Sequence, residues 1–164
     1  MAAGRPPQPA ARPRPGIAGF SLLELVLVLA ILTTVAALAS PRYAAAQARY
    51  RAACAASRVA DDLELARSEA RKTSSSQTVR FETNTSQIHL PGVRAMDRPQ
   101  KTWVTELDEP PYEAILVSAR LGGDEEISFD GFGMPDSGGE IVVEVAGLRR
   151  TVRIDPDTGE VLLP

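Results

Sequence analysis

Cysteine and histidine are almost absent from this chain, and there is no excess of basic residues. The one cysteine, Cys54, cannot form a disulfide within the chain, and the one histidine, His89, has no nucleophile or metal-binding motif around it. The formal net charge is −3, so the chain lacks the surplus of Lys and Arg that gives proteins a general affinity for nucleic-acid phosphates. These shortages argue against an internal disulfide, a histidine-based site and a nucleic-acid-binding module.

Patterns typical of catalysis are missing as well. The serines at positions 74–76 lie in a polar segment that indicates a flexible linker and not a nucleophile elbow. The globular core must be built from residues 77–164, which suffice for a small sheet fold but not for an elaborate catalytic cleft. We therefore predict no catalytic residue, no metal site and no cofactor, and a protein that is not an enzyme.

The most informative feature that is present is an apolar run from Phe20 to Ala39. Sixteen of its twenty residues are apolar, and a helix of this length is ~30 Å long, the thickness of a bilayer's hydrocarbon core. The run contains one carboxylate, Glu24, which costs on the order of 2.5–3.5 kcal/mol at the centre of a spanning helix. The sequence predicts a transmembrane helix whose acidic residue needs a partner.

Gly19 followed by Phe20, then by Glu24 and an unbroken apolar stretch, resembles the N-terminal signal of type IV prepilins and type II secretion pseudopilins. The resemblance implies that a prepilin peptidase cleaves between Gly19 and Phe20 and N-methylates Phe20. It also implies that Glu24 pairs with the Phe20 amine of a neighbouring subunit, which fixes the axial register of a filament. Pro41 occupies the place where this family has a proline that kinks the helix as it leaves the membrane.

The C-terminal part, from Ile127 to Leu163, contains Phe129, Gly131, Gly133, the strand Ile141 to Val145 and the ending Asp157-Thr158-Gly159-Glu160-Val161. With these features it resembles the minor pseudopilins of the GspH/FimT type. The resemblance implies a pilin-like fold and a minor pseudopilin of the type II secretion system, built into the periplasmic pseudopilus that drives protein export. The implied partners are other pseudopilins, the prepilin peptidase, the inner-membrane secretion platform and membrane lipid, and nucleic acid is not expected. The implied location is the inner membrane, with a single span and a periplasmic C-terminal domain.

Two other interpretations of the N-terminus remain open, a secretory signal peptide and a plain membrane anchor. Ala37-Leu38-Ala39 before Ser40 has the form of a signal-peptidase site, and three arginines precede the apolar run. Against a signal peptide, the run exceeds the usual ~7–15 apolar residues and contains Glu24. Arginines flank the run on both sides, so their count leaves the orientation open; they are Arg5, Arg12 and Arg14 before it and Arg42, Arg49 and Arg51 after it.

The sequence predicts an α+β fold in which a long N-terminal helix packs on a C-terminal antiparallel β-sheet or two-sheet β domain. The expected domains are a leader at 1–19, a transmembrane half-helix at 20–39, a periplasmic half-helix at 40–72 and a globular β domain at 73–164. Apolar residues recur at helical spacing in the second half-helix, where one stripe is expected to face the sheet. This stripe consists of Val59, Leu63, Ala66 and Ala70.

Beyond residue 76 the apolar residues alternate with polar ones, which is typical of half-buried strands. Turn sequences separate the expected strands, and Pro91-Gly92 is one of them. If Ala146-Gly147 is a two-residue hairpin loop, one face is apolar and the other carries opposite charges. The expected inward residues are Val79, Phe81, Ile88, Leu90, Ile127, Phe129, Ile141, Val143 and Val145, and the expected hairpin pairs are Val145 with Leu148, Glu144 with Arg149, Val143 with Arg150, Ile141 with Val152 and Glu140 with Arg153.

Three alternatives accompany this interpretation. In the first, the chain is a FimT-like minor pilin of a type IV pilus, involved in pilus assembly or DNA uptake. In the second, it is a singly anchored envelope protein without a filament. The third concerns a metal, because the carboxylates of Asp155, Asp157 and Glu160 have a spacing that could hold Ca²⁺, although Asp-Pro-Asp-Thr-Gly is first of all a turn sequence.

Overall fold

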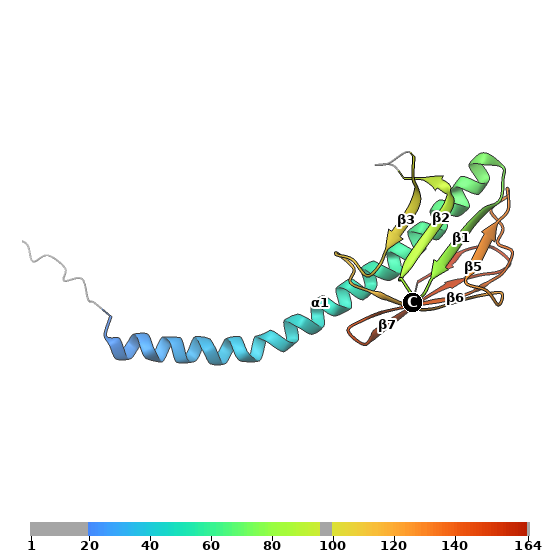
Figure 1. Ribbon diagram of the computed structural model, residues 1–164. Coiled ribbons are helices and arrows are strands. Elements are labelled where there is room, and N and C mark those ends of the chain that lie inside the picture. Colours follow the sequence, from blue (N-terminus) through green and yellow to red (C-terminus); the bar gives the residue numbers. More distant parts are fainter. Residues whose placement is uncertain (1–19, 96–99, 164) are drawn as a thin grey trace, which may run out of the picture. The chain divides into compact units, whose positions relative to one another are not determined.

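A computed structural model describes residues 20–95 and 100–163 of the chain (Figure 1). It divides into two units, one that ends at Ser40 and one that begins at Pro41. A single helix, α1 (Leu22–Thr73), starts in the first unit and ends in the second. The second unit contains every strand of the described residues and the whole of their buried core.

The C-terminal end of α1 is closed by its own backbone. Ser74 adopts a left-handed conformation with φ of 49°. The amide of Ser75 donates to the carbonyl of Ala70 over 3.2 Å, and the amide of Ser74 donates to the carbonyl of Arg71 over 3.3 Å. This pair of bonds is a Schellman motif, which satisfies carbonyls that the helix end leaves free. The polar segment expected as a loose linker is therefore an ordered helix cap.

Eight strands form two antiparallel four-stranded sheets. The first sheet has the order β3-β2-β1-β5 and the second the order β4-β6-β7-β8. An α+β fold with a two-sheet β domain, one of the two forms predicted, is thus confirmed. The strands are β1 (Gln77–Glu82), β2 (Gln87–Arg94), β3 (Thr102–Glu106), β4 (Ile115–Leu121), β5 (Glu126–Phe129), β6 (Gly139–Val145), β7 (Leu148–Ile154) and β8 (Val161–Leu162).

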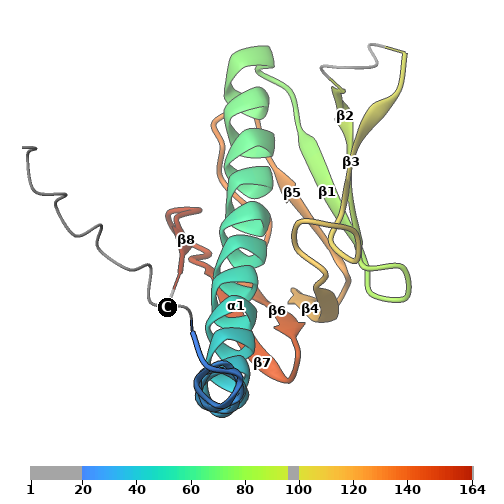
Figure 2. The same ribbon diagram turned by 90° about the vertical axis from the view of Figure 1, so that its left-hand side faces the viewer.

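The C-terminal half of α1 lies across the two sheets (Figure 2). The buried core is made of residues from the helix and from both sheets. Burying this apolar surface stabilises the domain by about 25 cal/mol per Å² removed from water. The predicted helix stripe and all of the predicted inward strand residues are buried, which confirms both patterns. The helix stripe is joined in the core by Ala52, Ala55 and Ala56 of α1, and by Leu107, Leu116, Leu121, Val152 and Ile154 of the β domain.

The turn predicted at Pro91-Gly92 is wrong, because both residues lie inside β2. The pairing of β2 with β3 shifts register between Leu90 and Arg94, so this stretch is a bulge. A bulge accommodates a proline because the ladder there does not need its missing N–H. Gly92 has a separate reason: a Cβ at this position would lie 1.5 Å from Oε1 of Gln77.

The hairpin of β6 and β7 has the register that the sequence predicts, from Val145 opposite Leu148 to Glu140 opposite Arg153. Its loop residues, Ala146 and Gly147, have φ of 49° and 81°. Positive φ at both positions is the mark of a type I′ turn, whose twist matches that of paired strands.

Candidate assembly site

The N-terminal half of α1 presents apolar side chains on all sides. From Phe20, which is 82% exposed, to Val35, the large apolar residues of this unit are exposed. The helix is long and apolar enough to cross a membrane, and none of its most apolar window is buried. Such a surface is stable in lipid or against other apolar helices, but not in water.

Ser21 begins this helix by capping it. The amide of Glu24 donates to Oγ of Ser21 over 3.2 Å, and the amide of Leu25 donates to the carbonyl of Ser21 over 3.1 Å. A serine followed three residues later by a glutamate is the sequence of a capping box. Glu24 thus lies in the first turn, where the helix dipole favours a negative charge.

Other polar side chains of this segment find partners within the helix. The hydroxyls of Thr33 and Thr34 donate to the carbonyls of Ala30 and Ile31 over 2.9 and 2.8 Å. Among the described residues, the carboxylate of Glu24 has no hydrogen-bond or ion-pair partner. Glu24, the acidic residue that needs a partner according to the sequence, therefore still lacks one in the folded helix.

The other predicted site residues are placed only in part. Phe20 lies two residues before the start of α1, and Gly19 lies outside the described residues. The backbone of Pro41 is helical, at the first position of the second unit, and its kink stays a prediction.

A polar cluster that the sequence did not reveal connects α1 to β3. The carboxylate of Asp62, 1% exposed, accepts from Nε1 of Trp103 over 3.1 Å and lies 3.3 Å from the guanidinium of Arg58. That guanidinium also stacks over the Trp103 ring, 5.2 Å from its centroid. Burial raises the pKa of Asp62, although the Thr105 hydroxyl, Arg58 and Trp103 all act to lower it.

A rigid loop after β5 displays an aromatic residue to solvent. Oδ1 of Asp130 accepts from the amides of Phe132 and Met134 over 2.9 and 2.8 Å. From α1, Arg67 donates to the carbonyl of Gly133 and Arg71 to that of Phe132, each over 3.1 Å. The Phe132 side chain is nonetheless 84% exposed, so the loop holds it outward, where a partner can contact it.

The remaining candidate residues serve the structure. His89 is half-buried on β2, 3.4 Å from a carboxylate oxygen of Glu82. Oδ1 of Asp155 accepts from the amides of Asp157 and Thr158, both over 2.9 Å, and these bonds hold its pKa below the usual value. Among the described residues no group of three or more His, Cys, Asp or Glu side chains is arranged to hold a metal ion. The Asp155 segment is thus a hydrogen-bonded turn.

Comparison with known proteins agrees with this architecture. The family model described as type II transport protein GspH matches residues 55–158, well over half of the chain. The model of the prokaryotic N-terminal methylation motif matches residues 14–40, which include Gly19, Phe20 and Glu24. No curated protein matches the chain.

Among solved structures, the fold is similar to that of the type IV minor pilin FimU of Pseudomonas aeruginosa. The TM-score is 0.51 and the sequence identity 17%, over 71% of this chain and 90% of that chain. At this identity the likeness shows a shared pilin-like fold.

Proposed function

The chain belongs to the family of type II transport protein GspH, and from this membership we propose how this minor pseudopilin of type II secretion is matured and assembled. Its family and fold are those of structural subunits and not of enzymes, and such subunits assemble with other pilin-like proteins. The apolar N-terminal helix anchors it in a membrane. The maturation, the contacts and the orientation that follow are proposals.

Maturation is cleavage between Gly19 and Phe20 by the prepilin peptidase, followed by N-methylation of Phe20. The match of the methylation motif to residues 14–40 supports this proposal. Cleavage there creates an ammonium group two residues before the start of α1 at Leu22. A cation at the positive end of a helix is destabilising, so the new terminus gains from any carboxylate brought close to it.

The observation that carries the assembly proposal is the lone carboxylate of Glu24 in the first turn of an exposed apolar helix. A charge costs on the order of 2.5–3.5 kcal/mol at the centre of a spanning helix, and pairing with a cation offsets the part of this cost that applies in the first turn. The Phe20 ammonium of a neighbouring subunit supplies that cation once the apolar helices pack side by side. The pairing fixes the axial register of one subunit against the next, because only one offset brings the two groups together.

The orientation follows the same scheme. The leader, residues 1–19, is cytoplasmic, residues 20–39 span the inner membrane, and the half-helix 40–72 and the β domain 73–164 are periplasmic. Pro41 turns the helix as it leaves the lipid, since a helix proline removes one backbone hydrogen bond. The inner-membrane secretion platform contacts the subunit during assembly, and the pseudopilus that forms drives protein export.

Replacing Glu24 by Ala and by Gln tests the proposal. We expect both variants to be cleaved, methylated and inserted, but not to crosslink to other pseudopilins or to co-purify with the pseudopilus. Ser21→Ala is the matched control, because it removes the helix cap at a cost of about 1 kcal/mol and leaves the carboxylate in place. Normal incorporation of Glu24→Ala would refute the role given to this residue.

The second candidate, a type IV pilus minor pilin active in DNA uptake, rests on the fold shared with FimU. The charge of the mature chain opposes DNA binding, since removing the three leader arginines changes the formal net charge from −3 to −6. A salt-dependent gel shift by the mature protein would favour this candidate. Finding genes for a secretion ATPase and an outer-membrane secretin beside the coding sequence would favour pseudopilin assembly.

A further inference from the structure

The outer edge of β7 is open where β8 ends. β8 pairs only with Arg153 and Ile154, while β7 extends back to Leu148. From Leu148 to Val152, about 17 Å of extended chain, β7 has β6 on one side and no strand of the described residues on the other.

The register shows which backbone groups this edge offers. A two-residue hairpin loop is closed by a pair that exchanges both hydrogen bonds, here Val145 and Leu148. Bonding to β6 then alternates along β7, so the N–H and C=O groups of Arg149 and Thr151 point outward. Arg153, the next outward residue, pairs with Leu162 of β8. Arg149 and Thr151 thus offer the backbone donors and acceptors on which another strand can add.

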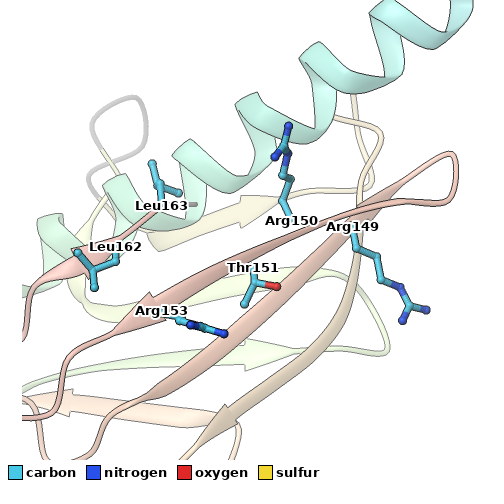
Figure 3. Close-up of a pocket in the computed structure, with 6 residues that line it drawn as sticks. All are labelled: Arg149, Arg150, Thr151, Arg153, Leu162 and Leu163. Carbon is cyan, nitrogen blue, oxygen red and sulfur yellow. The ribbon is translucent and has the colours of Figure 1, made fainter.

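Three arginines lie along this edge. A shallow cavity of about 470 Å³ lies along it, and Figure 3 shows the residues that line it. Among the described residues, the one ion pair that involves its three arginines joins Arg149 to Glu144, over 2.7 Å. The lining residues are Arg149, Arg150, Thr151, Arg153, Leu162 and Leu163.

The arginines lie on both faces of the sheet edge. Arg150 extends from β7 toward α1, whereas Arg149 and Arg153 extend away from it (Figure 3). Arg150 also lines a second cavity of about 160 Å³, with Ala53, Ala56, Ser57 and Leu163. Side chains of an added strand point alternately to the two faces, so both sets of side chains would meet a guanidinium group.

We propose that the outer edge of β7 binds an extended acidic segment of a partner protein by strand addition. The backbone of the segment pairs with Arg149 and Thr151, and its carboxylates reach Arg150 on one face and Arg153 on the other. Leu162 and Leu163 provide apolar contact at one end of the site. A basic segment is rejected by the same charges, so the edge selects its partner as well as binding it. The inference is independent of filament assembly.

Fluorescence anisotropy with the full-length protein in detergent micelles tests this proposal. The probe is a labelled short peptide with the repeat Glu-Glu-Val-Val, which places carboxylates on both faces of an added strand and which we expect to bind saturably. Thr151→Pro removes an outward N–H that β6 does not use, and Arg150→Glu reverses one charge. Each variant is expected to weaken binding at least about tenfold, an easily measured change in Kd. Arg120→Glu, on β4 at the opposite edge of the same sheet, is the matched control and should bind like the wild type.

Several outcomes would overturn the proposal. Undiminished binding by a Thr151→Pro protein with a normal unfolding transition would exclude strand addition. Equal binding of a Lys-Val peptide would exclude selection by charge. Displacement of the probe by a short DNA duplex, or by phosphatidylglycerol added to the micelles, at equal anionic charge would make the edge a general anion-binding surface.

Discussion

Replacing Asp62 by Asn removes the charge of the most buried carboxyl among the described residues and keeps the shape of the side chain. In the native protein Oδ1 of Asp62 accepts a hydrogen bond from Trp103 and forms an ion pair with Arg58. Oδ2 has no hydrogen-bond partner among the described residues. Burial is the largest influence on this group and raises its pKa. The asparagine keeps an acceptor for the Trp103 N–H and removes the buried negative charge.

The sign of the pH effect follows from the raised pKa. An unfolded Asp titrates near about 3.9, so between that pH and the higher native pKa the folded state holds a proton that the unfolded state has lost. The contribution of Asp62 to the free energy of unfolding is fully present below its pKa in the unfolded state. This contribution is lost as pH rises through its pKa in the native state. Asp62→Asn has no such loss. Its free energy of unfolding relative to wild type should therefore rise across this window, by about 1.4 kcal/mol per unit of pKa elevation.

Urea unfolding from about pH 3.5 to 8, followed by the fluorescence of Trp103, measures this difference. Trp103 is the only tryptophan of the chain, and it contacts the substituted residue. Asp108→Asn, at an exposed position that does not act on the Asp62 carboxyl, is the control and should change stability by less than about 0.5 kcal/mol. A wild type that gains stability over Asp62→Asn as pH rises would refute the reasoning, because Arg58 and Trp103 would then outweigh burial.

Two further predictions concern packing and backbone. Leu63→Ala, at a fully buried position of α1, should cost about 2–5 kcal/mol in urea unfolding, and a cost below that of the half-buried Leu65→Ala would contradict the observed core. Gly147→Ala should cost about 1–2 kcal/mol, because its φ is 81° and its surroundings are open. Gly133→Ala, with a similar φ of 79°, should cost more in the same assay, because its Cβ would lie 2.3 Å from Nε of Arg71; equal costs would exclude that contact.

Features with a local physical cause could be predicted from the sequence. Alternation of apolar residues revealed the buried strand faces, and a positive-φ loop sequence set the register of the β6–β7 hairpin. Glu24 was identifiable because a charge in an apolar run is anomalous without any knowledge of the fold.

Features that depend on distant neighbours could not be predicted. Pro91-Gly92 has the composition of a turn, and only its position against Gln77 and β3 makes it a bulge. A charged residue of a helix is usually exposed. Asp62 is buried because Trp103 of the distant strand β3 packs against it. The display of Phe132 depends in the same way on arginines far away in the sequence.

The open edge of β7 illustrates the same limit. The sequence placed Arg150 opposite Val143, and the register confirms that position. What it could not indicate is how far β8 extends along β7, since a strand of two residues leaves no pattern. The proposed interaction surface therefore depends on the length of a strand that the sequence does not reveal.

Mass spectrometry of the N-terminus of the mature protein, purified from membranes, tests the central claim most directly. The pairing of Glu24 with a neighbour requires a free amine at the start of α1, and this amine exists only after cleavage. We predict a chain that begins with N-methylated Phe20. A chain that begins at Ser40, or one that retains Arg5, Arg12 and Arg14, would contradict the account.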